Sequence, residues 1–288
     1  MPILRLLLCL CAVALVAFAQ EDRTQITTGT YRDVDPMISP DGNSLAFASN
    51  RTGHFNIFVF SYKTSGTLQL TQSDKDDRYP NWSADGRKVV FGSNRTGKGD
   101  IYETSNDGSS GFLQLTDAPL LEEYPNYPSD RRGLLYARDS TKSGFTQKMQ
   151  VILSDSLPAS SNAVVLAEGD QPRFSPNGSR IVFVSHRTKN DDIWTMTREG
   201  SSQTQLTTDD KDDTDPYYSP NGSKIVFSSK RTGNYDIWVM DSDGGNQRQL
   251  TFDQADEIQP CWSVGGYIYY THQVSETASN IYRIKAPK

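Results

Sequence analysis

The sequence predicts an all-β fold, a six-bladed β-propeller of four-stranded antiparallel blades. Three observations predict it: a repeat that fills the chain, a regular set of turns inside each unit, and a strand motif shared by the two ends. The stretch DPMISPDGNSLAFASNRTGHFNIFVF returns as YPNWSADGRKVVFGSNRTGKGDIYET and then twice more. The units begin near prolines that lie 44 to 47 residues apart: Pro36, Pro80, Pro125, Pro172, Pro216 and Pro260. A period of this length is typical of propeller blades.

Each unit contains turn residues that separate four short strands. An Asp-Gly or Asn-Gly pair follows the first strand and favours a tight hairpin; the pairs are Asp41-Gly42, Asp85-Gly86, Asn177-Gly178 and Asn221-Gly222. The loop after the second strand carries Ser-Asn-Arg-Thr-Gly or a close variant. A third strand, such as 236–240, then leads through a Gly-rich turn to a fourth strand that ends in Gln-Leu-Thr.

The two ends of the chain complete one blade between them. The sixth unit stops after its third strand, 280–284, and lacks a fourth. Near the N-terminus, Gln25-Ile26-Thr27 matches the Gln-Leu-Thr endings of the other units, and Thr27 precedes Pro36 by the same nine residues. We therefore expect the N-terminal strand to join the last blade and close the ring, which removes two open sheet edges.

Residues 1–19 have the features of a cleaved signal peptide: Arg5, an apolar run over 6–18 and an Ala-Phe-Ala ending. The run is too short for a membrane-spanning helix, which needs ~20 residues, so we predict no transmembrane segment in the mature chain. Without it the chain has 28 basic and 35 acidic residues, a net charge of −7, and one cysteine, Cys261. This charge disfavours nucleic-acid binding, and a lone cysteine forms no internal disulfide. We predict an exported monomer, periplasmic in a bacterium and otherwise secreted, with its propeller in residues 20–288.

Units such as YYSPNGSKIVFSSKRTGNYDIWVMDSDGGNQRQLT resemble the propeller repeats of TolB-type proteins of the periplasmic Tol–Pal envelope system. The resemblance covers residues 24–288. Two features depart from that family. TolB-type proteins of the Tol system carry an N-terminal α/β domain, whereas here the first strand follows the signal directly. The third unit, YPNYPSDRRGLLYARDSTKSG, also lacks the aromatic-Ser entry and the Gln-Leu-Thr ending. The resemblance thus implies the fold, and the function has to be argued from the residues.

Propeller topology places the loops that enter each blade on the same face as the Ser-Asn-Arg-Thr-Gly loops. All six entry loops carry carboxylates, so we expect an acidic ring with arginines at one mouth of the channel, and we predict that a protein or envelope polymer binds there. The candidate partner-binding residues are Asp33, Asp35, Arg51, Asp76, Asp77, Arg78, Tyr79, Arg95, Glu122, Glu123, Tyr124, Arg187, Asp213, Asp215, Arg231, Asp256 and Glu257; Glu168, Asp170 and Asp212 lie in the same loops.

The four loop arginines have two interpretations. In the first, each guanidinium ties its own loop to a neighbouring carboxylate or carbonyl, and the motif is structural. In the second, the arginines anchor a bound partner at the rim. Only the second interpretation predicts that their substitution weakens binding while the fold stays intact.

The sequence holds no recognisable catalytic motif, and we predict a binding protein without enzymatic activity. It has no Gly-x-Ser-x-Gly, His-Glu-x-x-His or phosphate-binding Gly loop. Two metal sites are worth testing. Asp35, Asp215 and Gln259 come from adjacent blades at the channel mouth and offer oxygen ligands suited to calcium. His54, His186 and His272 lie on one face and could bind a transition metal, which would suit the alternative function, a metal-dependent carbohydrate lyase or hydrolase.

Overall fold

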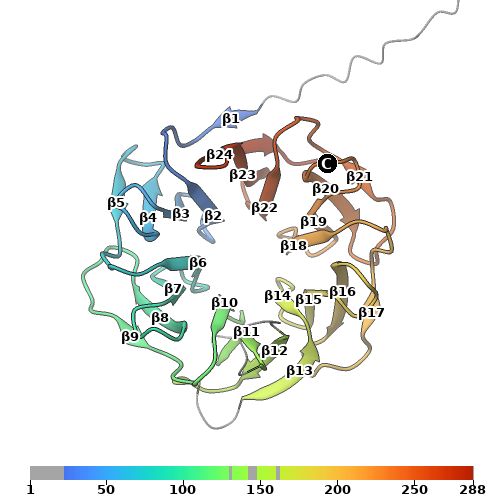
Figure 1. Ribbon diagram of the computed structural model, residues 1–288, viewed down its shortest axis with the longest axis horizontal. Helices are drawn as coiled ribbons and strands as arrows, with labels where there is room; N and C mark the ends of the chain where they lie inside the picture. Colours follow the sequence, from blue (N-terminus) through green and yellow to red (C-terminus); the bar gives the residue numbers. More distant parts are fainter. Residues whose placement is uncertain (1–22, 130–131, 142–147, 160–162, 288) are drawn as a thin grey trace, which may run out of the picture.

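The computed structural model describes residues 23–129, 132–141, 148–159 and 163–287. Six four-stranded sheets stand in a ring around a central channel, with the first strand of each blade innermost (Figure 1). Every strand pair in these sheets is antiparallel. The predicted six-bladed propeller is therefore confirmed. Within the described ranges, no helix is long and apolar enough to cross a membrane, and the predicted signal peptide, 1–19, lies outside them.

The strands follow the repeat units in order. Blade 1 contains β2 (Asp33–Ile38), β3 (Ser44–Ser49), β4 (Asn56–Ser61) and β5 (Thr67–Gln69). Blade 2 contains β6 (Asp77–Trp82), β7 (Lys88–Ser93), β8 (Asp100–Ser105) and β9 (Leu113–Gln114). Blade 3 contains β10 (Glu122–Asn126), β11 (Leu134–Asp139), β12 (Met149–Ser154) and β13 (Val164–Glu168).

The second half of the ring has the same order. Blade 4 contains β14 (Asp170–Phe174), β15 (Arg180–Ser185), β16 (Asp192–Thr197) and β17 (Thr204–Gln205). Blade 5 contains β18 (Asp213–Tyr218), β19 (Lys224–Ser229), β20 (Asp236–Asp241) and β21 (Arg248–Gln249). Blade 6 contains β22 (Glu257–Trp262), β23 (Tyr267–Ser275), β24 (Ala278–Lys285) and β1 (Thr24–Gln25).

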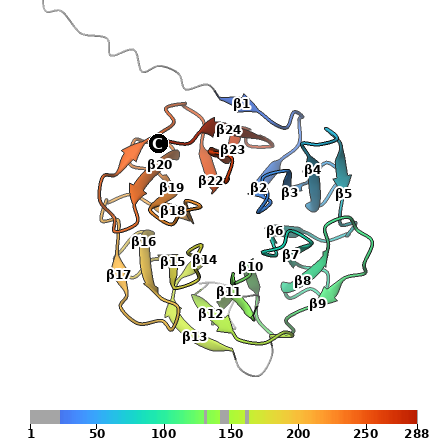
Figure 2. The ribbon, with the colours of Figure 1, turned by 180° about the vertical axis from the view of Figure 1, so that it is seen from behind.

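The N-terminal strand closes the ring as the matched ends of the chain predict. In both views of the ribbon, β1 runs along the outer edge of β24 (Figures 1 and 2), where Thr24 pairs with Arg283 and Gln25 with Tyr282. The Gln-Leu-Thr ending explains why this segment fits. Its threonine hydroxyl accepts a hydrogen bond from a backbone N–H of the third strand, at 2.9 Å for Thr27 and Ile281 and at 2.9 Å for Thr71 and Ile57.

The core lies between neighbouring blades rather than at the centre of the ring. Alternating strand residues point to one face and pack against the next blade. The second strands supply a buried phenylalanine in four blades: Phe47, Phe91, Phe183 and Phe227. The aromatic residue of the Pro-x-aromatic-Ser entry also fixes adjacent blades to one another, since the indole N–H of Trp82 donates to the carbonyl of Met37 at 2.8 Å.

Candidate functional site

Six residues with strained backbones line the channel. Each immediately precedes a repeat proline, and each has a left-handed φ between 49° and 58°: Asp35, Tyr79, Tyr124, Gln171, Asp215 and Gln259. The strand register shifts at these positions, as between Val34 and Met37 in blade 1, so each is a bulge. The proline that follows has no N–H to donate, and a bulge on an inner strand accommodates it. All six residues line the central cavity.

The bulges lie inside the innermost strands. In blades 1, 2 and 5 the strand begins two residues before the bulge, at Asp33, Asp77 and Asp213. The strand continues through the bulge while the side chain turns into the channel. A left-handed non-glycine residue costs about 1–2 kcal/mol. Six of them in one ring mark the channel as a functional candidate.

The proposed calcium ligands lie together but are already engaged. Arg78 donates to the carboxylate of Asp35, with Nε 2.6 Å from Oδ2. The amide oxygen of Gln259 accepts from the backbone N–H of Asp35 at 3.0 Å and from the hydroxyl of Thr271 at 2.8 Å. Asp215 accepts from Ser228 at 3.1 Å, and burial raises its pKa. A calcium ion bound here would have to replace the guanidinium on Asp35.

Two other carboxyl groups at this mouth have no cation of their own. Among the described residues, Glu123 has no hydrogen-bond or ion-pair partner, and Asp170 accepts one hydrogen bond, from the backbone N–H of Gln171 at 2.7 Å. Burial, together with the negative charge of Asp170, raises the pKa of Glu123 to about 7. Burial also raises the pKa of Asp170 to about 7. The nearby rings of Tyr79 and Tyr124 are tilted at 33° to each other, with their centres 4.0 Å apart.

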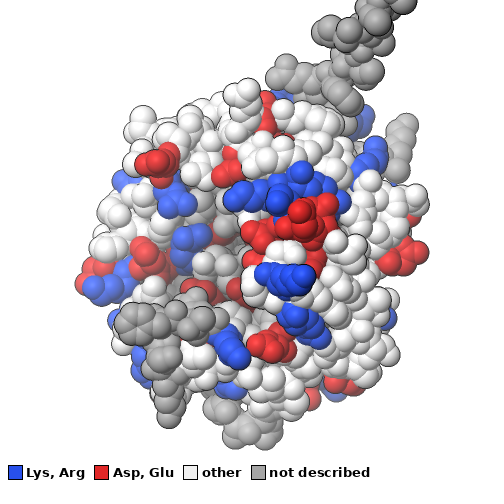
Figure 3. Space-filling model, turned by 45° about the vertical axis from the view of Figure 1, so that its right-hand side comes forward, with Lys and Arg blue, Asp and Glu red and all other residues white. Residues whose placement is uncertain are grey.

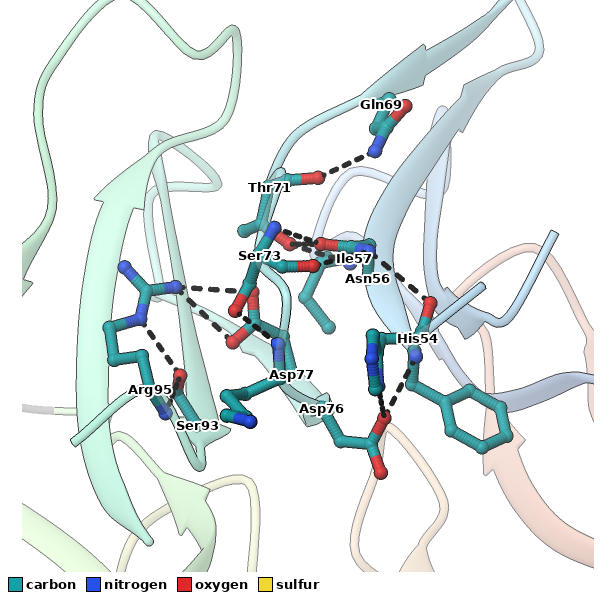
Figure 4. Close-up of polar contacts among 12 residues, drawn as sticks. His54, Asn56, Ile57, Gln69, Thr71, Ser73, Asp76, Asp77, Ser93 and Arg95 are labelled. Carbon is teal, nitrogen blue, oxygen red and sulfur yellow. Dashed lines mark hydrogen bonds and ion pairs between the residues drawn. The ribbon is translucent and has the colours of Figure 1, made fainter. Parts of the chain in front are cut away.

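The arginines of the Ser-Asn-Arg-Thr-Gly loops form clasps within their own blades. Figure 4 shows Arg95 pointing toward Asp77 and Ser93. Its Nη2 lies 3.2 and 3.1 Å from the two carboxylate oxygens of Asp77, and its Nε donates to the Ser93 hydroxyl at 2.8 Å. Arg51 on Asp33 and Arg231 on Asp213 repeat this arrangement. Each guanidinium also lies over aromatic rings, at 4.5 Å from that of Tyr102 for Arg95. These contacts give the Ser-Asn-Arg-Thr-Gly loop a structural role within each blade. Its role in partner binding stays a prediction.

Two blades build the clasp from different residues. In blade 4, Gly169 takes the position of the carboxylate, and Arg187 instead donates to the carbonyl of Glu168 at 3.1 Å. In blade 6 the guanidinium comes from the N-terminal segment. Arg23 forms ion pairs with Asp253 and with the buried Glu257, and it lies over the Tyr282 ring at 5.0 Å. The chain end thus supplies the side chain that the last blade lacks.

Burial separates the predicted partner-binding residues into two groups. The clasp carboxylates Asp33, Asp77, Asp213 and Glu257 are fully buried, and Glu122 is 1% exposed, so these five do not ring the mouth as free charges. Asp76 and Asp256 accept hydrogen bonds from the backbone N–H groups of Phe55 and Tyr235, at 3.0 and 2.9 Å. Of the predicted residues, Asp35, Tyr79, Tyr124 and Asp215 line the central cavity. A smaller pocket, which shares Tyr79 with it, is lined by Asp76, Arg78, Glu122 and Glu123. Figure 3 shows one side of the molecule, with acidic and basic side chains next to one another.

The three histidines do not form one metal site within the described residues. His54 lies 3.5 Å from Asp76 (Figure 4) and His186 lies 3.3 Å from Asp191. His272 instead joins Asp253 and Glu257, and the ligand atoms of these three lie within 4.8 Å of one another. Because Arg23 pairs with both carboxylates, this group is part of the blade 6 clasp.

The opposite mouth, where the first hairpin of each blade turns, holds a cavity of about 290 Å³. Its wall includes the aromatic residues Trp82, Phe174, Tyr217, Tyr218 and Trp262. Arg173 is the one charged side chain among its described lining residues. This mouth was not predicted from the sequence. A signal was available, since the residues that follow the six repeat prolines are Met37, Asn81, Asn126, Arg173, Tyr217 and Cys261, of which one is charged.

Comparison with known proteins identifies the family. The model of the TolB β-propeller domain matches residues 11–169 and 125–286, which together cover most of the chain. The chain belongs to the TolB β-propeller family. Among curated proteins, none matches it at a significant level of sequence similarity.

Solved structures share this TolB-type fold at low sequence identity. TolB from Acinetobacter baumannii has a TM-score of 0.71 at 17% identity; the match covers 86% of this chain, which spans 65% of the length of that protein. A putative TolB from Agrobacterium tumefaciens has a TM-score of 0.66 at 20% identity, with 91% and 93% of the two chains covered. An oligogalacturonate lyase in complex with manganese has a TM-score of 0.64 at 14% identity, with 93% and 95% covered. At such identities the likeness concerns the fold.

Proposed function

We propose that this TolB-type propeller is a non-enzymatic binding protein that docks a protein partner at the entry-loop mouth of its channel. The observation that carries the proposal is the pair of half-buried carboxyl groups, Glu123 and Asp170, which have no cation of their own. A lysine or arginine side chain of the partner would enter between them.

The electrostatics of this mouth favour a cationic group. Arg78 forms its hydrogen bonds with Asp35, and its positive charge lowers the pKa of Glu123 less than burial and the negative charge of Asp170 raise it. Removing carboxylates from water without a paired cation is costly, and an incoming ammonium or guanidinium offsets that cost. The adjacent rings of Tyr79 and Tyr124 add apolar surface of the kind that anchors partners.

Export and a monomeric state belong to the same proposal. Export is supported by the signal features of residues 1–19 and by the single cysteine of the mature chain. Calcium on Asp35, Asp215 and Gln259 is also proposed, as a weak ligand that competes with Arg78. A stoichiometric transition metal in the purified protein, found by elemental analysis, would favour the alternative of a metal-dependent lyase or hydrolase.

The test is recovery of a partner from the envelope fraction of the source organism by the immobilised mature protein, with bound proteins identified by mass spectrometry. A Glu123→Gln/Asp170→Asn double variant should lose at least one partner that the wild type recovers, by about tenfold or more. A matched control, Asp74→Asn/Asp210→Asn, removes two exposed charges from loops of the same face and should recover that partner normally. Equal losses in both variants would mean that only the net charge matters.

The pH dependence gives a second test of the same site. Because the pKa values of Glu123 and Asp170 lie at about 7, their negative charge, and with it partner recovery, should rise between pH 6 and pH 8. Recovery that is independent of pH in this range, with the partner's own charge constant, would argue against the proposal.

A further inference from the structure

The cavity at the hairpin-side mouth has an apolar rim built from one repeat position. The residues after the entry serines or their counterparts in the six blades are Pro40, Ala84, Ser129, Pro176, Pro220 and Val264. Five of the six are apolar, and Val264 is 62% exposed. Exposed apolar residues that surround a concave, aromatic wall are typical of ligand-binding sites.

The guanidinium of Arg173 lies at the floor of this cavity. Its Nη1 atom is buried and has no hydrogen-bond partner among the described residues. Arg173 also forms no ion pair there, and its nearest aromatic partner is Tyr217, with the ring centre 6.0 Å away. A guanidinium without an acceptor is costly to enclose, so native proteins complete such a group with an ordered water, an ion or a ligand.

Arg173 lines the central cavity together with Asp35 and Asp215, which act on it electrostatically. These carboxylates accept hydrogen bonds from other groups, among them Arg78, Ser228 and the backbone N–H of Gln259. On the hairpin side the lining residues that the structure describes include no carboxylate, so an anionic ligand can approach Arg173 from that side without a carboxylate to repel it.

We propose that this cavity binds the C-terminal carboxylate of a peptide chain, with the carboxylate on Arg173 and an apolar terminal side chain against the aromatic side chains of the wall. A planar guanidinium can donate two parallel N–H groups that match the two oxygens of a carboxylate. The proposal concerns a site at the mouth opposite to the one that carries the proposed function, and either can fail without the other.

The apolar rim and the aromatic side chains favour a peptide end over a sugar acid. Three polar groups of the cavity are already engaged: Trp82 donates to Met37, Asn126 accepts from the N–H of Phe174, and Ser175 donates to Asn177. A ligand with one carboxylate and an otherwise apolar surface fits Arg173 beside these aromatic side chains. A sugar acid would bring several hydroxyl groups against the apolar rim, at a cost for each that stays without a partner.

The test measures binding of short peptides through the fluorescence of Trp82 and Trp262, both of which lie in the wall. The probes are a panel of N-acetylated tripeptides with apolar terminal residues, each as the free acid and as the C-terminal amide, together with galacturonate. We expect saturable binding of at least one free acid and an affinity at least about tenfold lower for its amide. Binding of galacturonate in preference to every peptide, equal binding of acid and amide, or no binding by any acid would overturn the proposal.

Two variants link the binding to the floor and the rim. Arg173→Met should reduce the affinity for the free acid at least about tenfold and leave that for the amide unchanged. Pro220→Asp lies at an exposed rim position and adds a negative charge without changing the floor. It should weaken binding of the free-acid peptide at low salt only. The Glu123→Gln/Asp170→Asn variant should bind the peptide normally, which separates this site from the entry-loop mouth. Unchanged acid affinity in Arg173→Met, with the fold intact by melting temperature, would overturn the assignment.

Discussion

The two mouths of the channel are built from the same six repeats, yet they place charge in opposite ways. At the entry-loop mouth, carboxylates and arginines are abundant, and most of them pair with one another inside the blades, as Asp213 does with Arg231. At the hairpin mouth, one charged side chain, Arg173, stands among the described lining residues, and its Nη1 atom has no hydrogen-bond partner. The comparison teaches that a dense set of charges can be scaffold, while a charge without an ion-pair partner is the better candidate for a ligand site.

The largest effect should come from breaking a clasp at the entry-loop face. Arg231→Met leaves the carboxylate of Asp213, which is fully buried, without its guanidinium, and should cost about 3 kcal/mol of unfolding free energy. Arg187→Met is the matched control, because Arg187 lies over Trp194 in the same way but pairs with a carbonyl and Gln203. It should cost about 1 kcal/mol. Chemical denaturation measures both, and equal costs would show that the buried carboxylate does not matter.

The second effect concerns the unpaired carboxyl groups at the same mouth. In the unfolded chain Glu123 and Asp170 titrate near pH 4, but in the fold their pKa values are about 7. Between these values the folded state holds more protons, so wild-type stability should fall as the pH rises from 5 to 7. In the Glu123→Gln/Asp170→Asn variant, the unfolding free energy should decrease over this pH range by about 1–3 kcal/mol less than in the wild type. Unfolding free energies measured at several pH values test this, and parallel curves for the two proteins would contradict it.

A smaller effect, of opposite sign, is expected at the hairpin mouth. Arg173→Met removes a buried cation that has no acceptor, so the free protein should keep its stability or gain about 1 kcal/mol. A thermal melt without ligand measures the change. A loss of more than about 2 kcal/mol would mean that Arg173 serves the fold, by balancing Asp35 and Asp215, and would remove the contrast between the two mouths.

The smallest effect concerns calcium at the channel. The carboxylate of Asp35 already accepts hydrogen bonds from Arg78. Calcium should therefore raise the melting temperature of the wild type by only about 1–2 °C. Arg78→Met frees the carboxylate and should enlarge the shift. Magnesium, which prefers a smaller and more rigid site, serves as the control ion. Identical melts with and without calcium in both proteins would remove the calcium proposal.

The sequence was sufficient for the architecture because the fold repeats. Six prolines at near-constant spacing, and a threonine nine residues before five of them, predict the blades and their closure, and Thr27 accepts a hydrogen bond from Ile281 in the last blade. The sequence was not sufficient for the site. The clasp hides Asp33 and Asp77 behind Arg51 and Arg95, and no pattern of residue types shows that burial. The left-handed bulge also turns Asp35 into the channel, although its place before a proline suggests an ordinary extended strand.

The Arg23 clasp was missed for a related reason. In blades 1, 2 and 5 the arginine lies 18 residues after its carboxylate, which a repeat alignment displays directly. In blade 6 the arginine comes from the opposite end of the chain. Only the closed ring brings it to Glu257, so the pairing is a property of the tertiary structure.

The closing strand has a consequence for how the protein folds. β1 pairs with β24, and the contact between Thr27 and Ile281 spans 254 residues. Until both strands are in place, β1 has no partner and the edge of β24 stays open. Long-range pairings of this kind slow folding and expose the incomplete chain to aggregation. We therefore expect the propeller to be most prone to aggregation before β1 and β24 pair, and to be protected once the ring is closed.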